Sequence, residues 1–160
     1  MNMEKTENQL KYENYREQFK RLNSALHSGF NLEAMFIEYA ILEDRTESIL
    51  RHAGKWEAYL KKQGDGRNPT VDSKIRYIQR QAASNRKDLL NRYFSDELLG
   101  EILQWKEDRN RLIHALLKQQ LEHGEVAELA ARGKQLADAM RTQTGNYNRA
   151  IDRQKAKEIL

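Results

Sequence analysis

Apolar residues recur along most of the chain at alternating spacings of three and four residues, which is the period of an α-helix. One such stripe predicts a helix over residues 5–27. Residues 31–53 carry so many apolar positions that we expect a central helix, buried on more than one side. The segment 63–70 contains two glycines, an Asn-Pro pair and no apolar residue, which predicts a loop.

The second half of the chain shows the same helical period. Thr70 can cap the helix that follows the loop, and Ser95, followed by two acidic residues, predicts the start of a long helix. We expect that helix to continue to a stop at His123-Gly124. Residues 126–140 then form a last core helix, and Thr144-Gly145 predicts a break after it.

No stretch of useful length alternates apolar and polar residues, so we expect no β-sheet. The sequence therefore predicts an all-α fold, an antiparallel bundle of four to five helices. Residues 1–145 would form a single helical-bundle domain, and residues 146–160 a basic C-terminal segment that is also helical. The tyrosines and phenylalanines of the first two helices are expected in the core.

Composition narrows the classes of protein. The 160 residues suit one domain, and the absence of cysteine excludes a disulfide framework, a zinc knuckle and a thiol nucleophile. No run of about 18 apolar residues exists, so we expect no membrane span. The polar, mixed-charge N-terminus is unlike a secretory signal, and a cytoplasmic location is expected.

The net charge of +4 is distributed unevenly along the chain. Residues 61–92 carry nine basic and three acidic groups, +6, and residues 141–160 carry +3, whereas the segments 32–60 and 93–140 each carry −3. A basic block can attract polyphosphate by counterion release, although a solvated helix face is the alternative. The candidate contacts to an RNA backbone are Arg76, Arg80, Arg86 and Lys87.

Most catalytic motifs are absent from the sequence. It contains no GxGxxG or GxxxxGK[ST] loop and no HExxH, and its four histidines show no metal-ligand spacing. We therefore expect neither a metal nor a cofactor.

One stretch, Arg109-Asn110-Arg-Leu-Ile-His114, combines residues suited to chemistry on phosphate. On a helix, Asn110 and His114 share a face, and Arg109 lies about 140° round the axis, from where its long side chain can reach the same region. The apolar residues around the motif are expected to face the core and hold the helix in place: Leu112, Ile113, Leu116 and Leu117.

Physically, this trio fits phosphodiester chemistry. Histidine can transfer protons near neutral pH, and arginine can bind a phosphate in a bidentate way and stabilise the charge of the transition state. No metal ligand is required. The alternative is that His114 is an ordinary surface or interface histidine beside an arginine.

The motif, late in an all-helical chain of this size, resembles the signature of the HEPN superfamily, in which histidine follows an arginine after four to six residues and a polar residue often follows the arginine. The segment Glu38–Arg45 resembles the acidic-aromatic second helix of that group. The resemblance implies a HEPN-like bundle that dimerises, with a composite site at the dimer interface. Active members are metal-independent endoribonucleases of toxin–antitoxin, defence and RNA-processing systems, which leave a cyclic phosphate.

Carried onto this chain, the resemblance implies that His114 transfers protons, Arg109 holds the phosphate, and Asn110 orients the phosphate or the imidazole. Glu43 or Asp44 would pair with Arg109. Leu116 occupies the position of a tyrosine that one toxin branch modifies, so regulation of that kind is not expected.

The sequence leaves the role of Trp105 and the function of the protein open. Trp105, one turn before Arg109, is a core or dimer contact, or it stacks on a base. The expected partners are RNA, a second copy of the chain and a cognate antitoxin or regulatory protein. The alternatives to a nuclease are a non-catalytic HEPN-like RNA-binding or regulatory module and a helical scaffold without an RNA role.

Overall fold

The computed structural model describes residues 6–64 and 67–158, and within these ranges it contains seven helices and no strand. The helices are α1 (Glu7–His27), α2 (Asn31–His52), α3 (Trp56–Gln63), α4 (Val71–Ser84), α5 (Leu89–Tyr93), α6 (Asp96–Ala115) and α7 (His123–Glu158). The expected all-α fold is confirmed. Two of the helices, α3 and α5, are short.

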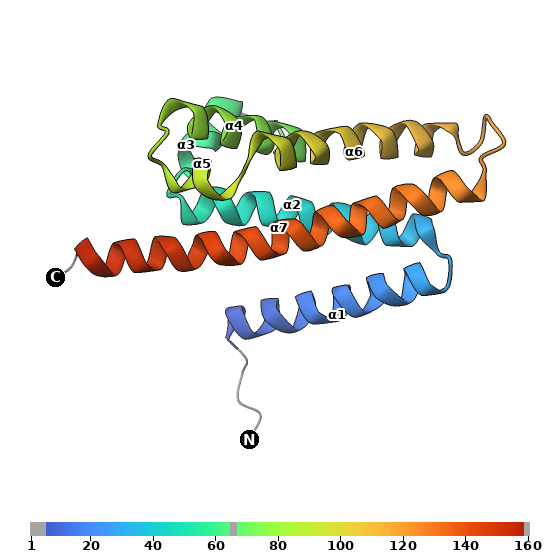
Figure 1. The fold of residues 1–160 in the computed structure, drawn as a ribbon, viewed down its shortest axis with the longest axis horizontal. Helices are drawn as coiled ribbons and strands as arrows, with labels where there is room; N and C mark the ends of the chain where they lie inside the picture. Colours follow the sequence, from blue (N-terminus) through green and yellow to red (C-terminus); the bar gives the residue numbers. More distant parts are fainter. Residues whose placement is uncertain (1–5, 65–66, 159–160) are drawn as a thin grey trace, which may run out of the picture.

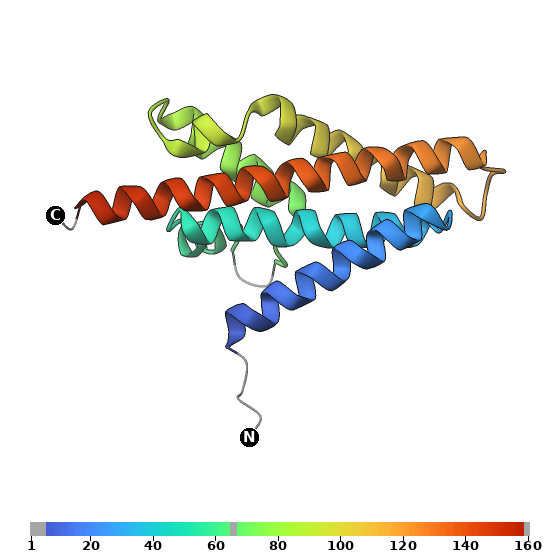
Figure 2. The same ribbon diagram turned by 60° about the horizontal axis from the view of Figure 1, so that its bottom comes forward.

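The helix pair α2 and α7 forms the centre of the molecule (Figures 1 and 2). The two lie side by side and run in the same direction, so the bundle is not antiparallel throughout. The antiparallel α1 packs along α2, and the antiparallel α6 packs along α7. Helices α4 and α5 close the remaining side, where they contact α2, α6 and α7.

Local capping chemistry determines where several helices begin. The Thr70 hydroxyl accepts a hydrogen bond from the Ser73 amide at 3.2 Å, and the Ser95 hydroxyl accepts one from the Leu98 amide at 3.2 Å. Each bond satisfies an amide that has no partner within its own helix. The N-terminal signals predicted at Thr70 and Ser95 are therefore confirmed.

Two expected helix boundaries are wrong. The sequence predicted that the α6 helix would stop at His123-Gly124, but α6 ends at Ala115 and α7 begins at His123. The Ala115 carbonyl accepts hydrogen bonds from the Lys118 and Gln119 amides. Helix α7 also continues without a break through Thr144-Gly145. Tertiary packing explains this continuity, because Tyr147, just beyond the expected break, is buried with its ring centre 5.4 Å from that of Phe94.

Several apolar side chains that the sequence assigned to the core lie on the surface. Tyr12 and Phe36 are each more than 60% exposed, and Leu117 is 99% exposed because it follows the end of α6. Within the described residues, no helix has both the length and the apolar character needed to cross a bilayer.

Candidate functional site

The predicted motif occupies the last turns of α6, where the side chain of Arg109 turns inward against α2. Only 8% of Arg109 is exposed, and the guanidinium carbon lies 4.7 Å from the ring centre of Tyr39 and 5.3 Å from that of Phe36. Such distances place the cation against two aromatic rings. Its Nη1 donates to Asn110 Oδ1 at 3.2 Å, whereas the buried Nε finds no partner among the described residues.

Burial also affects the electrostatics of Arg109. Desolvation lowers the pKa of Arg109, while Tyr39 and Glu38 oppose this shift. Since an arginine stays protonated in proteins, the site retains a permanent positive charge beneath the Phe36 ring.

The carboxyl group whose charge acts on Arg109 is Glu38, on the inner face of α2. Glu38 has no exposed surface, and neither carboxyl oxygen has a hydrogen-bond partner among the described residues. Burial raises the pKa of Glu38 to about 8, against the opposing charges of Lys134 and Arg109. At neutral pH most molecules therefore hold Glu38 in its protonated form.

A glycine on α7 makes room for this carboxyl. A Cβ atom placed on Gly133 would lie 2.7 Å from the Glu38 carboxyl carbon and 2.7 Å from Trp105 Cε2. Trp105 is fully buried and donates from its indole nitrogen to the Leu129 carbonyl at 3.0 Å. Trp105 is thus the core contact that one interpretation of the sequence gave, and it is not available to stack on a base.

The other two motif residues face outward. His114 is exposed in the last turn of α6, and Asn110, one turn earlier on the same face, is partly buried. The Asn110 side chain lies between the inward-facing Arg109 and the outward-facing His114. It accepts a hydrogen bond from the Arg109 guanidinium and lies on the same face of α6 as His114. Arg109 and Asn110 are therefore joined within one copy, whereas the structure records no bond from His114 to either.

The acidic residues expected to pair with Arg109 lie elsewhere, so that expectation is wrong. Glu43 Oε1 is 3.8 Å from the buried Lys74 Nζ, and Asp44 pairs with Arg45 and Lys11. The carboxyl group that does interact with the Arg109 charge is Glu38. The missed signal is a carboxylate on the apolar stripe of α2, three residues after Met35 and four before Leu42.

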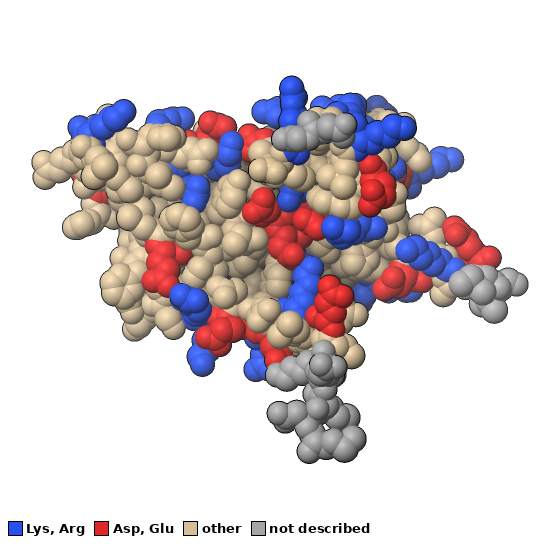
Figure 3. Space-filling view, turned by 180° about the vertical axis from the view of Figure 1, so that it is seen from behind, with Lys and Arg blue, Asp and Glu red and all other residues tan. Residues whose placement is uncertain are grey.

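The predicted RNA contacts Arg76, Arg80, Arg86 and Lys87 are all exposed, on α4 and on the connection to α5. They lie toward the opposite end of the molecule's long axis from the C-terminal end of α6. Seen from behind, Lys and Arg side chains gather at the upper right, over α3 and α4 (Figure 3). Within one copy, these residues and the motif do not form a single site.

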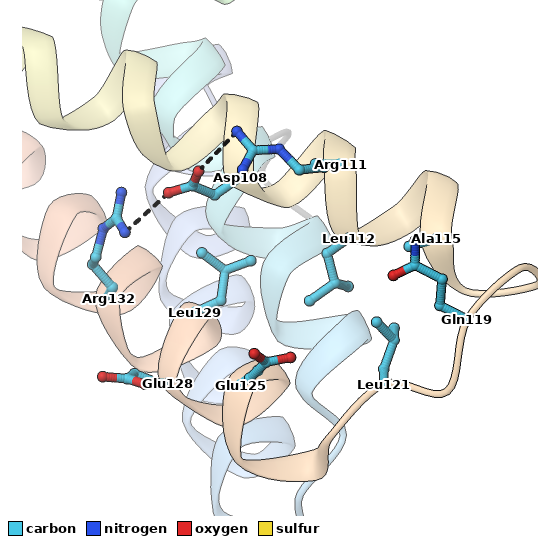
Figure 4. Close-up of a pocket in the computed structure, with 10 residues that line it drawn as sticks. All are labelled: Asp108, Arg111, Leu112, Ala115, Gln119, Leu121, Glu125, Glu128, Leu129 and Arg132. Carbon is cyan, nitrogen blue, oxygen red and sulfur yellow. Dashed lines mark ion pairs between the residues drawn. The ribbon is translucent and has the colours of Figure 1, made fainter.

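A groove of 380 Å³ lies between the last turns of α6 and the start of α7 (Figure 4). In its wall, Asp108 bridges Arg111 at 3.5 Å and Arg132 at 3.1 Å. None of the three motif residues lines this groove. By the helical period it opens on the side of α6 away from Asn110 and His114, so it is separate from the candidate site.

Among the described residues, no group of three or more histidine, aspartate or glutamate side chains is placed to hold a metal ion. Comparison of the chain with protein-family models, curated proteins and solved structures found no match. The geometry of Arg109, Asn110, His114 and Glu38 is therefore the basis for assigning a function.

Replacing Glu38 by glutamine should flatten the pH dependence of stability. With the pKa of Glu38 raised from 4.5 to about 8, the folded protein binds a proton that the unfolded chain loses. The free energy of unfolding therefore falls as the pH rises from about 4.5 to about 8, by an amount on the order of a few kcal/mol. Urea unfolding across this range measures the slope.

The matched control is Glu57→Gln, at an exposed carboxylate of α3. It should keep the wild-type slope while Glu38→Gln reduces it. Equal slopes in the wild type and the Glu38 variant would show that the buried carboxyl does not hold its proton.

Proposed function

We propose that the protein is a metal-independent endoribonuclease of the HEPN type, built on a HEPN-like bundle and active as a homodimer. The observation that carries the proposal is the arrangement at the end of α6. A buried, permanently charged Arg109 is bonded to Asn110, and an exposed His114 lies one turn further along the same face as Asn110. A fixed positive charge and a side chain that can transfer protons are thus both carried by the last turns of α6, on different faces of the helix.

The proposed chemistry uses the 2′-hydroxyl of the RNA as the nucleophile. Its oxygen attacks the adjacent phosphorus, the bond from phosphorus to the 5′-oxygen breaks, and the products are a 2′,3′-cyclic phosphate and a 5′-hydroxyl. A proton leaves the 2′-oxygen and a proton reaches the 5′-oxygen, and His114 carries out one of these two transfers while water carries out the other. The Arg109 guanidinium stabilises the charge on the phosphate. Asn110 orients the guanidinium, to which it is already bonded at 3.2 Å.

The directions of the side chains favour a site made by two copies. Arg109 and His114 leave α6 about 140° apart, so one copy does not present both to one phosphate directly. Beside the guanidinium, Phe36 leaves 67% of its surface exposed, and Leu32, one turn earlier on α2, leaves 39%. Exposed apolar surface of this kind marks interaction sites, and a second copy covering it would lie next to Arg109.

Replacing Phe36 by aspartate should weaken the dimer. In a two-fold interface each such residue is buried twice, and burying one phenylalanine contributes about 1.5–3 kcal/mol. We expect the dissociation constant of the dimer, measured by sedimentation velocity, to rise at least about tenfold.

Tyr12→Asp is the control, since Tyr12 is an equally exposed aromatic residue on α1. A wild-type protein that stays monomeric at high concentration, or a Phe36 variant that dimerises as well as the wild type, would overturn the dimer proposal.

The function itself is tested by incubating the full chain with single-stranded RNA in the presence of EDTA. Cleavage under these conditions supports the proposal, and cleavage that needs an added metal contradicts it. A nuclease of this kind needs restraint in the cell, so we propose a cognate antitoxin or regulatory protein as a further partner.

The second candidate is a non-catalytic HEPN-like module that binds RNA or regulates another protein. The observation that favours it is the burial of Arg109 next to Glu38, which suits a structural role for the cation. Tight RNA binding without any cleavage product would identify this second function.

A further inference from the structure

A cluster of cations shared by α3 and α4 forms a second surface feature, which we call the α3–α4 patch. Its members are Lys61 and Lys62, in the last turn of α3, and Arg76 and Arg80, on one face of α4, and all four are exposed. The two α3 lysines were not among the RNA contacts expected from the sequence. Figure 3 shows this part of the surface crowded with basic side chains.

The buried ring of Tyr77 lies near one cation from each of the two helices. Lys62 Nζ and Arg80 Cζ each lie 6.0 Å from the centre of the Tyr77 ring, so the two charges are within about 12 Å of each other. Tyr77 is only 5% exposed and packs edge-on against Tyr59, with ring centres 5.4 Å apart. The position of the patch is therefore set by the core.

The charge of the patch is not neutralised by its surroundings. Its four cations form no ion pair with the described residues. Two of the nearby acids are engaged elsewhere, because Asp72 pairs with Lys106 at 2.8 Å and Asp88 accepts from the Leu90 amide at 3.0 Å. The third acid of this segment, Asp65, lies outside the described residues. Glu57, exposed one turn before Lys61 on α3, offsets part of the charge and leaves the patch positive.

The chemistry of the patch favours one class of partner. Its surface carries no exposed large apolar residue, since those of the described chain lie on α1, on α2 and just before it, and after α6. Membrane-binding helices insert apolar side chains, and protein interfaces bury an apolar centre. A polyphosphate backbone needs only cations in suitable positions, because binding is driven by counterion release.

We propose that the α3–α4 patch binds the phosphodiester backbone of a nucleic-acid strand, independently of base sequence. The patch is separate from the α6 motif. Lys106 contacts Asp72 at 2.8 Å, and α4 and α6 run in opposite directions from this contact. Arg80 lies eight residues after Asp72 on α4, and His114 lies eight residues after Lys106 on α6. At 1.5 Å per residue, Arg80 and His114 are therefore about 24 Å apart along the helix axes.

This separation has a consequence that rests on the proposed function. A strand held at the patch must extend over about 24 Å before it reaches His114 of the same copy. At the duplex spacing of about 3.4 Å per nucleotide, a stacked strand needs on the order of seven nucleotides, and an extended strand needs fewer. Cleavage by the wild type should therefore become faster as the RNA lengthens through this range.

The binding test uses the full chain with His114→Ala, so that bound RNA stays intact, and labelled oligouridine and oligothymidine of equal length. Affinity is measured by fluorescence anisotropy at several salt concentrations. Adding Lys62→Glu and Arg80→Glu should weaken binding at least about tenfold. It should also reduce the slope of log affinity against log salt by about 1.4, at about 0.7 for each lost phosphate contact on a single strand.

The matched control is Arg16→Glu with Lys20→Glu, an equal change of charge on exposed residues of α1, which should change the affinity less than about twofold. Circular dichroism checks that both variants fold, and Lys62→Gln with Arg80→Gln repeats the test without reversed charge. Equal binding of RNA and DNA supports recognition of the phosphates, whereas binding of RNA alone identifies RNA as the source.

Three results would overturn the proposal: no salt-dependent binding, equal loss in the control variant, or binding of phosphatidylserine vesicles in place of nucleic acid. If the wild type binds a strand through the patch but cuts no RNA, the proposed function fails and the binding surface stands.

Discussion

Replacing His114 by alanine should abolish RNA cleavage while leaving the fold intact. In the proposed reaction the imidazole moves a proton in the rate-limiting step, and losing such a group typically costs about 10²–10⁴-fold in rate. Because the His114 side chain is exposed at the end of α6 and makes no recorded bond to the other described residues, its removal leaves the core unchanged. Cleavage of a labelled RNA in EDTA measures the rate, and circular dichroism checks the fold.

His27→Ala is the matched control, since His27 is also exposed in the last turn of its helix. It should cleave at the wild-type rate. If the His114 variant also cleaves at that rate, proton transfer at this residue is excluded and another group must carry the chemistry.

Arg109 needs a more careful substitution than His114. Its guanidinium lies between α6 and two aromatic rings of α2, so alanine would remove packing as well as charge. Arg109→Lys keeps the positive charge and loses the planar, bidentate head. We expect this variant to remain folded with strongly reduced cleavage, and wild-type cleavage would argue that Arg109 is structural only.

Introducing a single methyl group at Gly133 should destabilise the protein strongly. The added Cβ would lie 2.7 Å from both the Glu38 carboxyl carbon and Trp105 Cε2, closer than real Cβ contacts come. Overpacking of this kind costs about 1–3 kcal/mol and occasionally more, and both neighbours here are fully buried and have little room to move. We expect a loss of about 3 kcal/mol in the free energy of urea unfolding.

Gly100→Ala is the matched control on α6, where an added Cβ meets nothing within 4 Å. It should stabilise the protein by about 0.5–1 kcal/mol, because alanine is the better helix former. Adding Glu38→Ala to Gly133→Ala removes one of the two clashing groups and should restore part of the loss. A Gly133 variant as stable as the wild type would mean that α2, α6 and α7 do not meet as described.

The features that could be predicted from the sequence are those set by neighbouring residues. The period of apolar positions indicated helices because it reflects one face of each, and Thr70 and Ser95 signalled helix starts because a cap bonds within its own turn. The motif was also visible, since Arg109, Asn110 and His114 lie within six residues.

The features that could not be predicted depend on contacts between distant segments. The parallel course of α2 and α7 is a property of the whole bundle, and it is what places Gly133 against Glu38. The exposure of Phe36 follows from the packing of α2, and no local pattern distinguishes it from the core residues beside it. The continuity of α7 past Gly145 likewise depends on the burial of Tyr147 against α5.

The most direct test of the nuclease function is to identify the ends of the RNA after incubation with the full chain in EDTA. We expect mass spectrometry to find new 3′ ends carrying a 2′,3′-cyclic phosphate and new 5′-hydroxyl ends, in the wild type and not in the His114→Ala variant. RNA that remains intact, or ends that form only when a divalent metal is added, would contradict the function proposed for Arg109, Asn110 and His114.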